Sequence, residues 1–236
     1  MHQFRIESIV PIHFGNIDVS FTNSSLYMVI AATLVTLLTV LGMSRGSLVP
    51  GRLQSVAELS YEFVANMLRD NVGDAGKRYF PFVFTLFMFV LVCNLLGMTP
   101  YSFTVTSHII ITFAFALLIF IGVTLIAFAK HGIGFLKFFA PHGVPIYLLL
   151  LVVPIEVVSY FSRPFSLSIR LFANMMAGHT VLKVFAGFVI ALGVFGVAPL
   201  VFMVALTGLE VMVACLQAYV FAILTCIYLN DALHMH

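Results

Sequence analysis

The chain has 236 residues, of which 62% are hydrophobic and only 8% are charged, and its formal net charge is +2. Soluble domains carry about 25% charged residues, whereas residues 80–129 contain no Asp, Glu, Lys or Arg. This composition excludes a water-soluble domain and predicts an all-α integral membrane protein. No run of Lys or Arg indicates nucleic-acid binding, and the three cysteines lack the spacing of a metal site or a disulfide framework.

Residues 1–25 carry no recognisable signal peptide, because no basic start is followed by an apolar core and a small-residue cleavage site. We expect this N-terminal segment to face outward. The first apolar run, residues 26–43, predicts a transmembrane helix, with Ser24 and Ser25 as candidate caps at its start.

Residues 54–72 differ from the apolar runs because charged side chains are interspersed among them. One helical face is hydrophobic and consists of Val56, Leu59, Phe63 and Met67. The charged residues lie on other faces, at Glu58, Glu62, Arg69 and Asp70. The pattern predicts an interfacial amphipathic helix, with docking against a neighbouring subunit as the alternative.

Residues 80–129 predict a transmembrane helical hairpin, with helices over 80–99 and 108–129 and a short connection across Pro100. The basic residues are concentrated in two connections. The connection before residue 80 holds Arg45, Arg52, Arg69, Lys77 and Arg78, and the connection after residue 129 holds Lys130 and Lys137. The Pro100 turn holds none. By the positive-inside rule, we expect the basic connections and the C-terminus on the cytoplasmic or matrix side and the N-terminus outside.

The stretch from Val144 to about Leu192 is too long for one upright helix. Its nearly fifty residues would span about 70 Å as a continuous helix, over twice the roughly 30 Å hydrocarbon core. Either Pro154 and Pro164 divide it into two ordinary spans, or a kinked helix lies strongly tilted in the membrane. The residues alone permit both arrangements.

Gly193, Gly196 and Pro199 predict a turn after this stretch, followed by a last helix over residues 200–228. Residues 144–229 thus form a helix pair that carries the charges placed inside hydrophobic sequence. Residues 230–236 form a C-terminal tail, whose His234 and His236 are expected to be solvated rather than to bind metal.

Polar residues recur at helical spacing in this pair. Glu156, Arg163 and Arg170 are seven residues apart and share one helical face, with Asn174 four residues further on. On the last helix, Glu210 and Gln217 also repeat at seven. His179 and Lys183 lie four apart on roughly the opposite face from Arg170.

Some of these residues have ordinary explanations. Arg163 and Lys183 can extend to the membrane interface, and His179 can be a hydrogen-bonded core histidine. Arg170 and Glu210 are harder to explain, because apolar-dominated sequence surrounds both. An arginine near the bilayer centre costs about 2.5 to 3.5 kcal/mol on insertion scales, so it persists only with a partner or a wet cavity.

The chemistry of these groups predicts a proton path with a fixed positive barrier. Glu and His exchange protons, Asn and Gln orient waters, and Arg keeps its charge at physiological pH. A partner's carboxylate that slides past Arg170 is favoured in its ionised form, so it releases its proton on approach and takes up another after leaving. With an aqueous path from each side, this exchange transports protons in one direction. No moving carboxylate is evident in this chain, so a multisubunit machine is expected.

Four blocks of the chain match a known family: residues 94–102, 154–157, 162–179 and 209–221. At these blocks, and from about Phe14 onward, the chain resembles subunit a of the F-type ATP synthase membrane sector. In that family the arginine at the position of Arg170 faces the proton-carrying carboxylate of the rotating c ring and prevents a proton short circuit. The resemblance implies an outer access path lined by Asn174, His179, Glu210 and Gln217, and it assigns Glu156 to the inner path.

The resemblance also implies that residues 144–229 form a long, strongly tilted hairpin wrapped against the ring. The expected function is that of a non-catalytic stator subunit, which couples proton flow to rotation and ATP synthesis without a cofactor or metal. The expected partners are the c-ring subunits, peripheral-stalk b-type subunits, the remaining ATP synthase subunits and membrane lipid.

Some family members carry an acid at the position of His179 and a histidine at the position of Glu210, the reverse of this chain. The exchange predicts that the two groups act as a unit across facing helices. We expect a bacterial plasma (inner) membrane in preference to a mitochondrial inner membrane.

Two other classes of protein also place charges inside the membrane. A secondary transporter or channel does so, but the chain shows no internal repeat, and its charged residues within apolar sequence are concentrated in the last ninety positions. A structural scaffold would leave Arg170 and Glu210 unexplained. Co-purification with a ring of small hairpin subunits distinguishes the stator from both.

Overall fold

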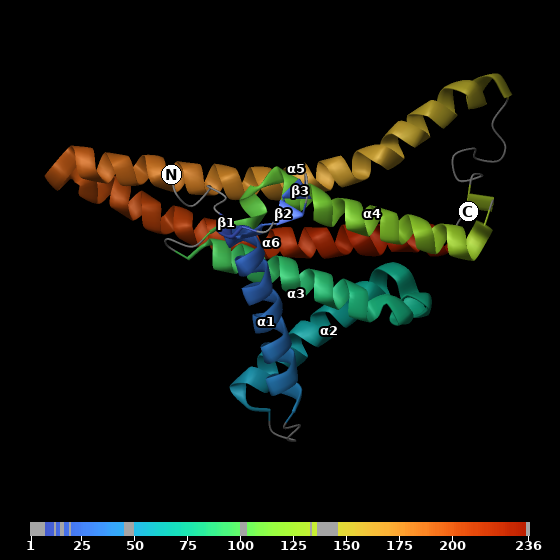
Figure 1. Cartoon of the computed structure of the whole chain (residues 1–236), viewed down its shortest axis with the longest axis horizontal. Coiled ribbons are helices and arrows are strands. Elements are labelled where there is room, and N and C mark those ends of the chain that lie inside the picture. Colours follow the sequence, from blue (N-terminus) through green and yellow to red (C-terminus); the bar gives the residue numbers. More distant parts are fainter. Residues whose placement is uncertain are drawn as a thin grey trace.

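The computed structural model describes residues 8–11, 13–14, 17–18, 20–44, 50–99, 103–132, 134–135 and 146–234. Long helices dominate this part of the chain (Figure 1). They are α1 (Asn23–Met43), α2 (Arg52–Val72), α3 (Phe80–Gly97), α4 (Ile109–His131), α5 (Ile146–Leu192) and α6 (Val197–Leu233). Short 3-10 helices connect them at η2 (Gly73–Tyr79), η3 (Val105–Ser107) and η5 (Gly193–Gly196).

Five helical stretches are long and apolar enough to cross a membrane, with α2 and α3 together forming one of them. The predicted all-α membrane fold is therefore confirmed. Several residues on which the expected loops, orientation and tail depend lie outside the described part of the chain: Arg45, Pro100, Lys137, Val144 and His236.

The N-terminal segment contains four short strands that the sequence analysis did not predict. β1 (Ser8–Val10) pairs antiparallel with β4 (Phe21–Thr22), and β2 (His13–Phe14) pairs with β3 (Ile17–Asp18). Strands of two or three residues are too short for an alternating pattern to be recognised.

The start of α1 corrects one detail of the sequence analysis. Thr22, rather than Ser24 or Ser25, is the N-cap: its side chain accepts a hydrogen bond of 3.4 Å from the backbone N–H of Ser25. This bond satisfies one of the amide groups that have no partner within a helix. From there α1 crosses the other long helices at a steep angle (Figure 1).

The helix α2 spans the segment predicted to be amphipathic and buries one side against α1, α3 and α6. The buried residues are Ala57, Val64, Met67, Leu68 and Val72. Of the predicted apolar face, Met67 is buried, whereas Val56, Leu59 and Phe63 remain exposed. Helix α2 thus has one apolar side buried in the chain and a second apolar surface that is exposed. Placement at the membrane interface and docking against a neighbouring subunit both stay predictions.

Helix α5 runs without interruption through Pro154 and Pro164, so the single long helix is correct and the two-span alternative is wrong. Proline lacks the backbone N–H and kinks a helix, and the N-terminal part of α5 is angled away from the rest (Figure 1). At 47 residues, α5 is about 70 Å long. A bilayer core of roughly 30 Å contains such a helix only when the helix is tilted.

Helix α6 returns alongside α5 after η5 and also packs against α2, α3 and α4 (Figure 1). It begins three residues before the predicted start and continues five residues beyond the predicted end, to Leu233. Part of the expected C-terminal tail is therefore helical. Its last carbonyls are held by α4, because Lys130 Nζ donates to Leu233 O at 3.0 Å and His131 Nε2 donates to Ala232 O at 3.1 Å.

Gly42 provides a test of the packing between α1 and α2. A Cβ atom at this position would lie 2.8 Å from Ala57 Cβ and 3.3 Å from Leu53 O, so α1 and α2 would have to separate. We expect Gly42→Ala to lower the free energy of unfolding by about 1 kcal/mol or more, as overpacking does. The loss of soluble, detergent-extracted chain on heating measures this effect.

Gly122→Ala is the matched control, because nothing lies within 4 Å of a Cβ at that position in α4. The control gains the usual helix preference of alanine over glycine. Equal thermal stability of the two variants would contradict the close approach of α1 and α2.

Candidate functional site

The candidate site begins with a polar seam between α5 and α6. Asn174 Nδ2 donates a hydrogen bond of 3.0 Å to Gln217 Oε1 across the two helices. Gln217 is buried, and its Nε2 has no partner among the described residues. Two residues that the sequence predicted to lie on the same path are thus in direct contact.

His179 lies on the same seam and connects it to the segment between α3 and α4. Its side chain is buried, and His179 Nε2 and Thr104 Oγ1 share a hydrogen bond of 3.3 Å. Thr104 Oγ1 also donates to Gly97 O at 3.3 Å. The histidine therefore connects α5 to the segment between α3 and α4.

Glu210 faces α5 at the position next to His179. A Cβ atom at Gly178 would overlap Glu210 Oε1, so the absence of a side chain at Gly178 provides the space for this carboxyl group. Both carboxyl oxygens are buried and have no hydrogen-bond partner in the described part of the chain. Glu210 thus approaches the residue before His179 on α5, and the joint action of His179 and Glu210 stays a prediction.

Further buried polar groups cluster around η3. Asn94 Nδ2 donates to Ala214 O at 3.2 Å, whereas Asn94 Oδ1, Thr106 Oγ1 and His108 Nε2 have no partner in the described ranges. His108 precedes α4 and stacks on Phe103, with ring centroids 5.0 Å apart. Burial lowers the pKa of His108, because it disfavours the charged imidazolium.

Arg170 is exposed on α5, and no ion pair to it occurs among residues 146–234 or elsewhere in the described ranges. The surrounding surface of α5 is apolar, with Phe165, Ile169 and Met176 also exposed. A guanidinium keeps its charge in any protein environment. Arg170 therefore needs a carboxylate or water from outside the chain.

Arg163 lies on the same face of α5 but has a partner within the chain. Arg163 Nη1 and Asp231 Oδ2 form an ion pair of 3.1 Å. Glu156, seven residues before Arg163, is partly buried and makes no ion pair or hydrogen bond within the described ranges. The structure thus keeps Glu156 apart from the seam, and Lys183 lies one turn beyond His179 on α5.

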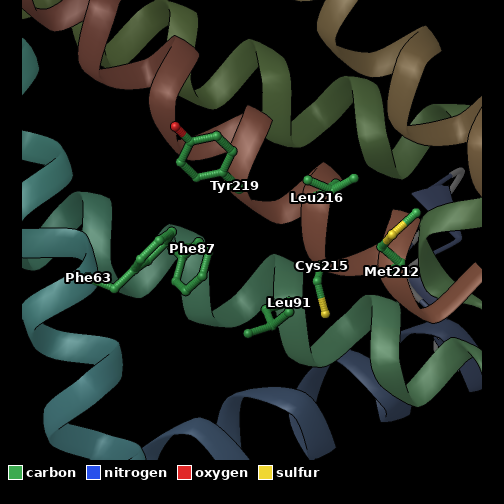
Figure 2. Close-up of a pocket in the computed structure, with 7 residues that line it drawn as sticks. All are labelled: Phe63, Phe87, Leu91, Met212, Cys215, Leu216 and Tyr219. Carbon is green, nitrogen blue, oxygen red and sulfur yellow. The ribbon is translucent and has the colours of Figure 1, made fainter.

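A groove of about 500 Å³ lies on the other side of α6 (Figure 2). Its walls come from α2, α3 and α6 and are formed by Phe63, Phe87, Leu91, Met212, Cys215, Leu216 and Tyr219. At about 100° per residue, Met212 and Tyr219 lie opposite Glu210 and Gln217 on α6. This apolar groove is therefore separate from the polar seam.

The described residues contain no group of three or more His, Cys, Asp and Glu side chains arranged to hold a metal ion. The functional groups of the seam are instead proton-exchanging and hydrogen-bonding side chains.

Comparison with known proteins decides the family. The model of the family described as ATP synthase A chain matches residues 25–230. The chain belongs to the ATP synthase A chain family.

Similar relatives cover the whole chain. ATP synthase subunit a of Pelagibacter ubique (strain HTCC1062) is 61% identical over 100% of this chain and 98% of its own length. The subunit a proteins of Mesorhizobium japonicum and of Chelativorans sp. (strain BNC1) are 61% and 62% identical over 99% of this chain, and they are covered over 96% and 97% of their lengths. These relatives are bacterial, which confirms the preference for a bacterial membrane.

Membership of the ATP synthase A chain family confirms the resemblance found in the sequence and excludes the transporter and scaffold readings. The sequence analysis missed Thr104, Gly178 and the pairing of Arg163 with Asp231. The signal for Thr104 was a group of polar residues between two charge-free helices. A glycine one position before His179 carried no signal, because its role depends on how α5 and α6 face each other.

Gly178 tests the position of the Glu210 carboxyl group. Gly178→Ala places a Cβ where Glu210 Oε1 lies, so the carboxyl group must move. We expect proton conduction through vesicles containing the assembled complex to fall about tenfold or more, as small displacements of reacting groups do. A pH-sensitive dye reports the rate.

Gly187→Ala is the matched control on α5, because no atom lies within 4 Å of a Cβ there. Wild-type conduction by both variants at equal assembly would show that the position of Glu210 is not critical.

Proposed function

We propose that this chain is the proton-conducting stator subunit of an F-type ATP synthase, in which Arg170 separates two half-channels and meets the carboxylates of a rotating c ring. The observation that carries the residue assignment is the exposed guanidinium of Arg170 on an apolar helix face, without a counter-ion in the described part of the chain. A moving partner carboxylate supplies the missing negative charge.

The charge of Arg170 determines what happens to that carboxylate. A guanidinium within a few ångströms favours the ionised form, so a protonated ring carboxyl releases its proton as it approaches. The arginine cannot accept that proton, since it stays protonated at any physiological pH. Protons therefore cannot pass directly from one side to the other at this position.

The polar seam between α5 and α6 supports the outer half-channel. Asn174, Gln217, His179 and Glu210 line it, and Thr104 connects His179 to the segment before α4. Several of its polar atoms are buried without a protein partner. Buried polar atoms of this kind are normally satisfied by water. The seam therefore provides titratable groups and water-binding groups in one continuous series.

Glu156 supports an inner half-channel, because it lies two turns before Arg163 and four turns before Arg170 on the same face of α5. It makes no ion pair within the described ranges. Placing the two paths at different positions along a tilted α5 requires the ring to turn between proton uptake and release. One charge crossing the membrane potential contributes about 2.3 kcal/mol per 100 mV to this motion.

The surface of the hairpin fits a large apolar partner. Few residues of the most apolar parts of α5 and α6 are buried within the chain. Exposed side chains along α5 include Ile155, Val158, Phe165 and Ile169. We propose that c-ring subunits cover the face with Arg170, while b-type peripheral-stalk subunits, other ATP synthase subunits and lipid cover the remaining apolar surfaces.

Arg170→Ala tests the barrier. We expect ATP-driven acidification of vesicles containing the assembled complex to fall to background, because the ring carboxylate loses the charge that drives proton release. Assembly is verified by co-purification of the ring. Arg78→Ala, which removes an exposed cation at η2, serves as the control with unchanged pumping. Wild-type pumping by Arg170→Ala would overturn the proposed mechanism.

The pair of His179 and Glu210 is tested by exchange. His179→Glu and Glu210→His each leave two like groups, and we expect each single variant to pump at less than about a tenth of the wild-type rate, since a proton-transfer group contributes typically 10²–10⁴-fold. The double variant restores one acid and one histidine and is expected to recover much of the rate. Pumping by the double variant below that of both single variants would exclude joint action.

A further inference from the structure

The pairing of Arg163 with Asp231 is the strongest feature outside the proton path. Arg163 Nη1 donates to Asp231 Oδ2 at 3.1 Å, and the two side chains are only 20% and 36% exposed. The residues are 68 positions apart and connect α5 to α6. Because both charges are partly withdrawn from solvent, each depends on the other more than a surface pair would.

Two aromatic rings hold the guanidinium in place. Arg163 Cζ lies 5.3 Å from the ring centroid of Tyr160 and 4.9 Å from that of Tyr228, both distances at which a cation is attracted to a ring face. Tyr160 is fixed in turn, since its hydroxyl shares a hydrogen bond of 2.7 Å with Thr124 Oγ1 on α4. Three helices therefore fix one arginine in one orientation.

This arginine lies close to the one that the mechanism uses. Arg163 and Arg170 are seven residues apart on one face of α5, about 10 Å along the helix. A ring carboxylate that moves past α5 encounters the surroundings of both. Arg170 carries a full positive charge without a counter-ion in the described ranges, whereas the charge of Arg163 is balanced by Asp231.

We propose that Asp231 is a positioning residue that cancels the charge of Arg163, so that Arg170 alone holds the ring carboxylate in its ionised form. This inference rests on the proposed function. Without Asp231, α5 would present two uncompensated guanidinium groups in series. The ring carboxylate would then remain ionised beyond Arg170, and its reprotonation from the inner side would be disfavoured.

The other charged and titratable groups around the pair do not replace Asp231. On α5 these are Glu156, Tyr160 and Arg170, and on α6 Tyr228. On α4, Lys130 and His131 are engaged with the carbonyls at the end of α6. Tyrosine is neutral at pH 7, and Glu156 makes no ion pair with Arg163. Asp231 is thus the only acid that contacts Arg163 in the described ranges.

The test compares Asp231→Asn with the double variant Arg163→Gln/Asp231→Asn in vesicles containing the assembled complex. Asp231→Asn keeps the size of the side chain and leaves Arg163 uncompensated. We expect about a tenfold slower proton conduction at neutral inner pH, with recovery when the inner pH is lowered by about one unit, because an extra cation favours the ionised carboxylate by that order. The double variant removes both charges and is expected to conduct within about twofold of wild type at neutral pH.

Asp74→Asn is the matched control. It leaves Lys77 without its partner in an exposed pair of 2.7 Å at η2, away from the face with Arg170. We expect wild-type conduction and an unchanged pH profile. Assembly of each variant is verified by co-purification with the ring.

The outcomes separate this inference from the proposed function. If the double variant is as slow as Asp231→Asn, the pair is only a structural link and the inference is overturned. The inference is also overturned if a lower inner pH does not restore proton conduction by Asp231→Asn. Arg170→Ala is measured in the same vesicles. If Arg170→Ala conducts and pumps normally, the proposed function fails instead. Loss with Arg170→Ala and a wild-type profile with Asp231→Asn overturns the charge cancellation alone.

Discussion

The balance of charge along one face of α5 is the constraint on which the rest of the structure depends. A guanidinium inside apolar surroundings is stable only with a counter-charge or water. The chain supplies a carboxylate for Arg163 through Asp231, and it supplies none for Arg170 within the described ranges. This difference distinguishes an arginine that stabilises the fold from an arginine that is left for a partner. The second charge, that of Arg170, is exposed on the long helix α5.

The hairpin of α5 and α6 carries both a series of polar contacts and an exposed charge. The polar contacts are the hydrogen bond between Asn174 and Gln217, the carboxyl of Glu210 beside Gly178, and the contact of His179 with Thr104. Arg170 is exposed on α5, where Phe165, Ile169 and Met176 are exposed as well. Asn174, which binds Gln217, lies one turn from Arg170 on α5, so the polar contacts between the two helices begin next to the exposed charge. The absence of a side chain at Gly178 allows the Glu210 carboxyl group to approach α5 closely.

Much of this arrangement could be predicted from the sequence, because it depends on local periodicity. The spacing of Glu156, Arg163 and Arg170 predicts one shared face, and the apolar runs predict the five spans. Contacts between helices require their relative rotation and register, which periodicity does not contain. The pairing of Arg163 with Asp231 was missed for this reason, since Asp231 was assigned to the C-terminal tail. The roles of Gly178 and Thr104 depend in the same way on neighbours distant in sequence, and the Thr22 cap on local backbone geometry.

The attachment of the end of α6 to α4 has a mechanical meaning. Lys130 and His131 bind the last carbonyls of α6, at the end of the hairpin opposite the η5 turn (Figure 1). Under the proposed function, a turning c ring exerts a sideways force on α5 and α6. Because two hydrogen bonds and the link through Tyr160 and Thr124 join this end to α4, the load passes into the bundle instead of bending a free helix end.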